Sequence, residues 1–216
     1  MMTGKNLSKL IEELRVRMSQ PLPGSVVHEV LRARPIGQLL PKFDHKLPPK
    51  LGSVLILLYE DDGSVKFPLI KRPTYTGTHS AQVSLPGGKL EPDEDVFAAA
   101  LREAEEEIGV NRNDIHLIGK LSDFNVLPSN FLVTPVVAYI DYVPKFVPDA
   151  HEVERVIQAD LLDLLNEDAI KESEILAAGL YRMLAPHFLI EQEIVWGATA
   201  MMLNEFRSIL KDADSG

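Results

Sequence analysis

Apolar residues recur along this chain at two kinds of spacing, one typical of helices and the other typical of strands. Spacings of three and four predict amphipathic helices over residues 7–19, 93–109 and 198–210. Short apolar or alternating runs predict strands over residues 54–59, 65–70, 81–85, 114–121, 131–141, 153–157 and 188–196. Because strands and helices alternate within 216 residues, the pattern predicts an α/β fold, an α/β/α sandwich around a mixed sheet.

The first fifty residues differ in character from the rest. Prolines recur through residues 25–50, which predicts an irregular connection after the first helix. We therefore expect an N-terminal helix and irregular arm over residues 1–50 and a main domain over residues 51–216. The apolar side of the first helix is expected to pack on this domain or on a partner subunit. Since the closing helix has an apolar side too, a homodimer is one expectation for the chain.

A glycine loop followed by an acidic helix stands out at residues 86–110. Asp93 or Asp95 can cap the start of this helix, and Gly109 can end it. One side has a stripe of apolar residues that must face a core, namely Phe97, Leu101, Ala104 and Ile108. The other side has three carboxylates, those of Glu103, Glu106 and Glu107.

Carboxylates on adjacent turns of a helix repel one another unless a cation lies between them. Hard divalent ions such as Mg²⁺ and Mn²⁺ take oxygen ligands, and substrate phosphates commonly complete the coordination of Mg²⁺. The acidic side of the helix therefore predicts a Mg²⁺ or Mn²⁺ site. Arg102 lies beside Glu103 and one turn before Glu106, so its guanidinium group can hold a carboxylate in orientation. The alternative is an acidic helix face that is merely solvated.

Composition and charge narrow the classes of function. The formal net charge is −10, which argues against nucleic acid as a partner because such binding needs clustered lysine and arginine. An acidic site accepts an anionic substrate only where metal ions invert the local field, so the charge also favours a metal site. The chain has no cysteine, which excludes thiolate chemistry. With no apolar run long enough for a membrane span and no apolar signal segment, we expect no membrane association and a cytoplasmic location.

The acidic helix and its loop also fit a longer pattern, Gly-x5-Glu-x7-Arg-Glu-U-x-Glu-Glu-x-Gly-U, in which U is aliphatic. The matching positions are Gly88, Glu94, Arg102, Glu103, Ala104, Glu106, Glu107, Gly109 and Val110. The chain therefore resembles the Nudix hydrolases. This resemblance implies a Nudix-type fold and the metal-dependent hydrolysis of a nucleoside diphosphate linked to another moiety. It also implies a set of metal ligands, Glu103, Glu106, Glu107 and the backbone carbonyl of Gly87, with Glu94 in support.

The resemblance implies roles for further residues. Arg102 would orient Glu103, and the catalytic base would lie either inside the pattern, as Glu103, or on a later loop, as Glu152. The expected catalytic residues are accordingly Glu103, Glu106, Arg102 and Glu152. The candidate contacts to a small-molecule nucleotide substrate are Lys71, Arg72, His79 and Lys89.

A narrower resemblance covers most of residues 52–203. Residues 79–88 are similar to the pattern His-x-Gly-x-Val-x-Phe-Pro-Gly-Gly of the coenzyme A pyrophosphatase branch, and residues 128–137 and 196–200 resemble its later segments. The resemblance implies cleavage of coenzyme A or acyl-coenzyme A to 3′,5′-ADP and (acyl-)4′-phosphopantetheine. Three positions depart from the branch pattern, namely Gly77, Ala81 and Leu85.

Two alternatives to coenzyme A stay open at this point. The same chemistry could act on ADP-ribose, NADH or another nucleoside diphosphate derivative, because the departures fall in the segment before the metal site. A non-catalytic Nudix-fold binding or regulatory module is the second alternative. Such a module would be expected to lack one or more of the carboxylates that this chain keeps.

Overall fold

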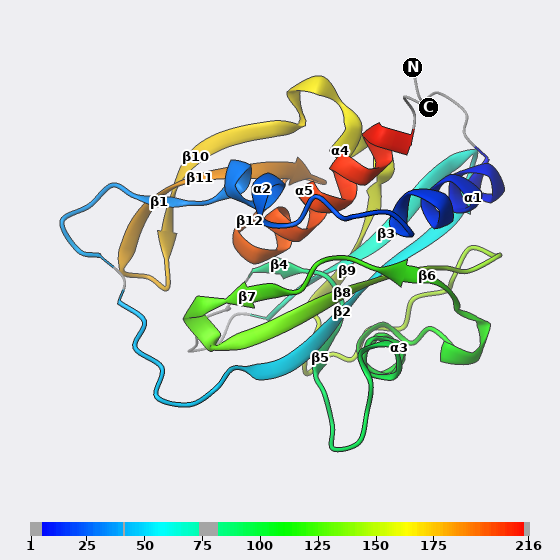
Figure 1. The fold of residues 1–216 in the computed structure, drawn as a ribbon, viewed down its shortest axis with the longest axis horizontal. Coiled ribbons are helices and arrows are strands. Elements are labelled where there is room, and N and C mark those ends of the chain that lie inside the picture. Colours follow the sequence, from blue (N-terminus) through cyan, green and yellow to red (C-terminus); the bar gives the residue numbers. More distant parts are fainter. Residues whose placement is uncertain (1–5, 41, 74–81, 214–216) are drawn as a thin grey trace.

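The computed structural model describes residues 6–40, 42–73 and 82–213. Two layers of helices enclose a mixed sheet in it, which confirms the predicted α/β/α sandwich (Figure 1). The strands of the larger sheet are β2 (Lys50–Asp61), β3 (Ser64–Lys71), β4 (Val83–Ser84), β5 (Gly87–Lys89), β6 (His116–Lys120), β7 (Phe124–Val126), β8 (Phe131–Tyr139) and β9 (Arg155–Asp160). The parallel pair β2–β8 lies at its centre, and the other pairings are antiparallel.

Strand β2 is buried on both faces because its apolar run is continuous. Leu55, Leu57 and Tyr59 join the core under the acidic helix, whereas Ile56 and Leu58 join the core on the opposite face. A strand alternates its side chains between two faces, so only an unbroken apolar run satisfies both cores. The prediction of a central strand at residues 54–59 is confirmed.

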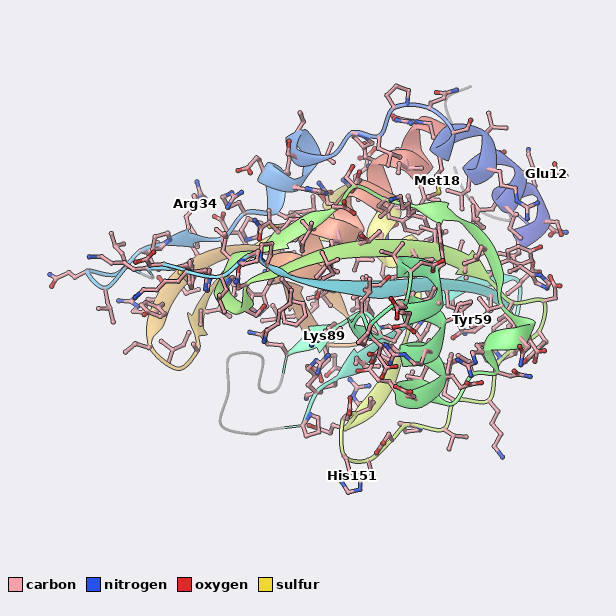
Figure 2. All side chains as sticks on the ribbon, turned by 60° about the horizontal axis from the view of Figure 1, so that its bottom comes forward. Glu12, Met18, Arg34, Tyr59, Lys89 and His151 are labelled. Atoms are coloured by element: carbon pink, nitrogen blue, oxygen red, sulfur yellow. The ribbon has the colours of Figure 1, made fainter. Side chains whose placement is uncertain are left out.

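The helices divide between the two faces of this sheet. Helix α3 (Val96–Ile108) covers one face, and Figures 1 and 2 both place it on the side away from α1 and α5. The other face is covered by α1 (Leu7–Met18), α2 (Ser25–His28), α4 (Leu161–Leu165) and α5 (Gly197–Ala213). Short 3-10 turns are η1 (Glu29–Leu31), η2 (Arg112–Asp114), η3 (Leu127–Ser129) and η4 (Glu167–Ala169). In the part of the chain that the structure describes, no helix is long and apolar enough to cross a bilayer.

A smaller sheet at one end was not predicted as such. Its strands are β1 (Arg34–Pro35), β10 (Ile170–Ala177), β11 (Tyr181–Ile190) and β12 (Glu193–Trp196). The predicted single strand over residues 188–196 is wrong, because Glu191 and Gln192 take positive φ angles and turn the chain between β11 and β12. The sequence pattern of the hairpin β10–β11 did not predict it. Apolar and polar residues alternate only weakly along β10, and β11 contains Pro186, a residue that argues against a strand interior.

The arm before β2 is more regular than expected. The prediction of an irregular connection over residues 25–50 is wrong in part, because α2, η1 and β1 fall within it. These elements are too short to show a hydrophobic period. The division at residue 50 stays a prediction, although α1 buries Leu7, Leu10 and Leu14 in the core that it shares with α5.

The apolar faces invoked for a homodimer are covered within the chain. On α1 the buried side chains are Leu7, Leu10, Ile11 and Leu14, and on α5 they include Met202, Leu203, Phe206, Ile209 and Leu210. Apart from Met202, both sets belong to one core. The structure therefore removes the reason for expecting a dimer through these two helices.

Candidate active site

The glycine loop lies against the start of β2 because its glycines have no side chain. Gly87 has φ +148°, and a Cβ atom there would lie 2.3 Å from the backbone oxygen of Ser53. A Cβ atom on Gly88 would lie 2.5 Å from the carboxylate of Glu103. Any larger residue at either position would push the loop away from β2 or from α3. The two glycines thus bring the backbone next to the acidic helix.

Helix α3 begins and ends at residues that the sequence pointed to. Of the two candidate caps, it is Asp95 whose side chain accepts hydrogen bonds from the backbone N–H groups of Phe97 and Ala98, at 2.9 and 2.8 Å. Gly109 ends the helix with φ +71°, as predicted. The apolar stripe faces the core, with Ala104 and Ile108 buried and Phe97 and Leu101 partly buried against them. This orientation turns the carboxylates towards the glycine loop.

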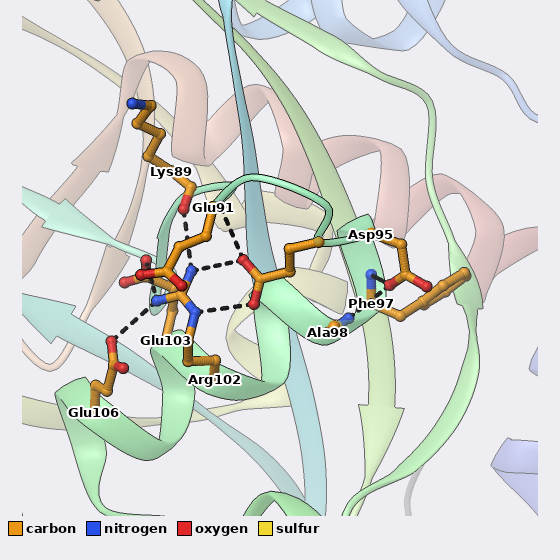
Figure 3. A network of polar contacts seen from close by, with 9 residues as sticks. Lys89, Glu91, Asp95, Phe97, Ala98, Arg102, Glu103 and Glu106 are labelled. Carbon is orange, nitrogen blue, oxygen red and sulfur yellow. Dashed lines mark hydrogen bonds and ion pairs between the residues drawn. The ribbon is translucent and has the colours of Figure 1, made fainter.

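Arg102 connects three carboxylates at the loop end of the helix (Figure 3). Its Nε and Nη2 atoms donate to the two oxygens of Glu94, both at 2.9 Å. Its Nη1 atom donates to Glu103 at 2.9 Å and to Glu106 at 3.0 Å. Its Nη2 atom also donates to the backbone oxygen of Lys89 at 3.1 Å. The guanidinium group of Arg102 therefore fixes the loop, Glu94 and two acids of the helix relative to one another.

These contacts shift the pKa values of the carboxylates in opposite directions. The hydrogen bonds from Arg102 hold the pKa of Glu94 below its ordinary value. Burial raises the pKa of Glu103 above its ordinary value, and the negative charges of Glu106 and Glu152 add to the rise, although Arg102 opposes it. Glu94 is thus a stable anion paired with Arg102, whereas Glu103 retains unfavourable charge that a cation would relieve.

Glu107 is placed differently from the sequence expectation. It was expected to share the polar side of the helix, but it is only 2% exposed and lies between α3 and the glycine loop. Its carboxylate accepts a hydrogen bond from the backbone N–H of Gly87 at 2.7 Å, and Arg72 Nη2 lies 3.6 Å away. Burial raises the pKa of Glu107 to about 7. The helical period alone could not reveal this, because the loop that covers Glu107 comes from another part of the chain.

Glu152 approaches the same acids from a different segment. The backbone N–H of Val147 donates to the backbone oxygen of Ile108 at 2.9 Å, and that of Asp149 donates to the backbone oxygen of Glu107 at 3.0 Å, so the segment runs along the end of α3. The side chain of Glu152 is exposed, and its charge raises the pKa values of both Glu103 and Glu107. The structure thus places the later candidate base near the acids of the helix.

The two adjacent cations at the end of β3 point to different partners. Arg72 meets Glu107 of α3, whereas Lys71 donates to Glu193 of β12 at 2.9 Å. Arg155, paired with Lys71 across β3 and β9, donates to Glu191 and Glu193. Of these three cations, Arg72 is thus the one on the side of the acidic helix. Lys89 is exposed at the end of β5, and His79 lies outside the described residues.

The acidic residues suit a divalent cation, although they do not form a complete set of metal ligands. Among the described residues, no three acidic or histidine side chains are close enough to make a complete metal site. Glu103 and Glu106 both accept hydrogen bonds from Nη1 of Arg102, whereas Glu107 accepts one from the backbone N–H of Gly87. The donors are hard carboxylate oxygens, and two of them have pKa values raised by burial and by neighbouring negative charge. This set fits an ion that prefers oxygen ligands.

Fold and site together define a class of protein, an α/β/α hydrolase with a carboxylate helix set against a glycine loop. A family model described as "NUDIX domain" matches residues 49–184. The chain belongs to the Nudix family, whose enzymes hydrolyse the pyrophosphate bond of nucleoside diphosphate derivatives with the help of divalent metal ions. The predicted family and enzyme class are thereby confirmed.

Several relatives support this assignment. The chain is 34% identical over 203 residues to "Nudix hydrolase 15, mitochondrial" of Arabidopsis thaliana, covering 90% of this chain and 70% of the relative. It is 36% identical to "Nudix hydrolase 22, chloroplastic" of the same plant, covering 72% of this chain but only 53% of the relative. It is 31% identical to "Uncharacterized Nudix hydrolase NudL" of Yersinia pestis, covering 62% of this chain and 67% of the relative.

A solved structure extends the likeness to the fold. The "MutT/nudix family protein from Enterococcus faecalis" superimposes with a TM-score of 0.51 at 16% identity, covering 93% of this chain and 74% of that one. At this identity the likeness concerns the fold alone. The substrate therefore has to be inferred from the site of this chain.

Proposed function

We propose that this protein hydrolyses the pyrophosphate bond of coenzyme A or acyl-coenzyme A, using Mg²⁺ or Mn²⁺, to 3′,5′-ADP and (acyl-)4′-phosphopantetheine. The observation that carries the hydrolase part is the junction of Glu103, Glu107 and the Gly87–Gly88 loop. There a closely packed glycine backbone, a buried carboxylate and a half-buried carboxylate meet. The coenzyme A part is supported by the branch-like segments at residues 79–88, 128–137 and 196–200.

In this proposal Glu103, Glu106, Glu107 and the carbonyl of Gly87 hold the divalent ion. The ion, when bound, supplies Lewis-acid stabilisation of the phosphates and a more acidic water. Arg102 keeps Glu103 in place and Glu94 locks Arg102, so the acids do not reorganise when substrate arrives. Glu103 or Glu152 takes the proton of the attacking water, and Arg72 binds an anionic group of the substrate on the side of α3.

The pH dependence of metal binding follows from Glu107. Because only the ionised carboxylate is a ligand and burial raises its pKa to about 7, protons compete with the metal below that pH. We expect the affinity for Mn²⁺ to rise from pH 6 to pH 8, by on the order of tenfold. In the metal-free protein the sign of the stability effect is opposite: stability falls as the pH rises from the ordinary glutamate range towards 7, since ionising the buried group is disfavoured.

Titration calorimetry with Mn²⁺ at pH 6, 7 and 8 measures this dependence. The variant Glu107→Gln is the control, because it has no carboxylate to titrate and should bind weakly with a flatter pH profile. An affinity of the wild-type protein that is constant between pH 6 and 8 would contradict the assignment of Glu107 as a ligand.

The substrate is tested by comparing pairs that differ in one phosphate. We expect coenzyme A to be cleaved with a kcat/KM about 10- to 100-fold above that of 3′-dephospho-coenzyme A, the range of a lost charged hydrogen bond. ADP-ribose and NADH complete the panel, and mass spectrometry of the products identifies the bond that breaks. Equal kcat/KM values for coenzyme A and 3′-dephospho-coenzyme A would contradict the coenzyme A assignment, but they would leave the broader pyrophosphohydrolase class unaffected.

ADP-ribose or another nucleoside diphosphate derivative is the second candidate. It is favoured by the departures at Ala81 and Leu85 and by the pairing of Lys71 and Arg155 with Glu193, which leaves fewer uncommitted cations for an extra phosphate.

The proposed cytoplasmic location also stays a prediction, since two plant relatives are named for the mitochondrion and the chloroplast.

A further inference from the structure

Among the described residues, one buried side-chain polar atom has no hydrogen-bond partner, the hydroxyl oxygen of Ser84 on β4. A buried hydroxyl without a partner is uncommon because leaving it unpaired costs free energy. Other buried hydroxyl groups in this region are satisfied: Ser53 donates to the backbone oxygen of Thr134 at 3.0 Å, and Thr199 donates to that of Val83 at 3.2 Å. The unpaired hydroxyl of Ser84 is therefore a specific exception.

The strand register places Ser84 on the face of the acidic helix. Ser84 is paired with Ile70 across β3 and β4, and residues directly opposite in an antiparallel pair point to the same face. Ile70 belongs to the core under α3, together with Ala104 and Ile108. The neighbouring pair Lys71 and Val83 points the other way, towards β12 and α5.

The same face holds the ends of the candidate site. Two residues after Ile70, Arg72 meets Glu107, and three residues after Ser84, Gly87 donates its N–H to Glu107. Ser84 thus precedes the glycine loop on the face where, in the proposed function, Arg72 binds an anionic group of the substrate and Gly87 helps to hold the metal ion. The hydroxyl of Ser84 is buried, but the residue as a whole is only partly buried. A serine side chain has three staggered χ1 rotamers, so its hydroxyl can change direction without movement of the backbone.

We propose that Ser84 is a substrate-binding residue whose hydroxyl donates a hydrogen bond to a phosphate oxygen of the bound pyrophosphate. The free protein leaves this donor unpaired, and the substrate supplies the missing acceptor. The proposal rests on the proposed pyrophosphohydrolase activity but not on coenzyme A as the substrate, because every candidate substrate has the same bridge.

The test compares four proteins, the wild type, Ser84→Ala, Ser84→Thr and Thr199→Val. The assay uses whichever of coenzyme A and ADP-ribose the wild type cleaves, and thermal unfolding is measured in parallel. Ser84→Ala should raise KM about 3- to 10-fold, the worth of one hydrogen bond. It should not lower Tm, since no bond within the protein is lost. Ser84→Thr keeps the hydroxyl and should restore a KM close to that of the wild type.

Thr199→Val is the matched control on the opposite side of β4. Its hydroxyl already donates within the protein, so its removal should lower Tm and leave KM unchanged. Two results would overturn the proposal: an unchanged KM in Ser84→Ala, or a Tm that falls in that variant, which would show a partner within the folded protein. A wild type that cleaves neither compound would refute the proposed function. Calorimetry with ADP and Mg²⁺ then tests Ser84 separately, because equal affinities of wild type and Ser84→Ala would overturn its role.

Discussion

Replacing Glu103 by glutamine is expected to lower kcat/KM by about 10²- to 10³-fold, the loss typical of removing one preorganised electrostatic group. Glutamine keeps the size of the side chain and an oxygen that can accept from Arg102. The variant thus removes the negative charge and the basic oxygen while it leaves the packing against Gly88 in place. Since Glu103 is both a proposed metal ligand and a candidate base, affinity for Mn²⁺ should fall together with the rate.

The same helix offers a matched control, Glu105→Gln. Glu105 pairs with Arg112 near the C-terminal end of α3, and it takes no part in the contacts of Arg102. Steady-state kinetics and Mn²⁺ titration should find it close to the wild type. Equal losses in both variants would mean that general negative charge on the helix matters, and a normal rate in Glu103→Gln would remove Glu103 from the mechanism.

The largest effect on stability is expected at Glu205, which lies on α5 away from the active site. Its carboxylate is fully buried, and it accepts from the Ser122 hydroxyl at 2.6 Å and from the backbone N–H of Gly24 at 3.1 Å. His28 Nε2 lies 2.9 Å from its other oxygen. Burial by itself would raise the pKa of Glu205, but the bonds from His28 and Ser122 bring it below its ordinary value.

Substituting Glu205 by alanine leaves these donors buried without an acceptor. We expect the free energy of unfolding to fall by roughly 3–5 kcal/mol, the range for breaking a buried ionic network. The corresponding decrease in Tm is on the order of 10 °C. Glu205→Gln should lose less, because its amide oxygen still accepts from Ser122. The active site is built from other elements, so kcat of the folded variant should change little.

Thermal and urea unfolding measure this effect, and their pH dependence gives a second check. Because the folded-state pKa of Glu205 is lowered, its contribution is present above the ordinary glutamate pKa and disappears as the pH falls below it. The stability gap between wild type and Glu205→Gln should therefore narrow on acidification. A small difference in the free energy of unfolding between wild type and Glu205→Ala at pH 7 would show that the network around Glu205 contributes little to the fold.

The local features of the active site were predictable because they depend on residues close together in the chain. Glu103 is the next residue after Arg102 and the helical period placed Glu106 one turn from it, and the structure shows both carboxylates in contact with Arg102. Asp95 and Gly109 bound the helix through hydrogen bonds and backbone angles that span only a few residues. The continuous apolar run of β2 likewise predicted a strand buried on both faces.

What the sequence determined by itself is thus the family, the α/β/α class and the acidic helix, all of which depend on periodicity or on a pattern with fixed spacing. Only the tertiary structure decided the burial of Glu107 under the glycine loop and the separation of Lys71 from Arg72 onto different faces. The same holds for the smaller sheet and for the unpaired hydroxyl of Ser84. These features depend on contacts between segments far apart in the chain, because burial and hydrogen-bond partners are set by packing and not by local spacing.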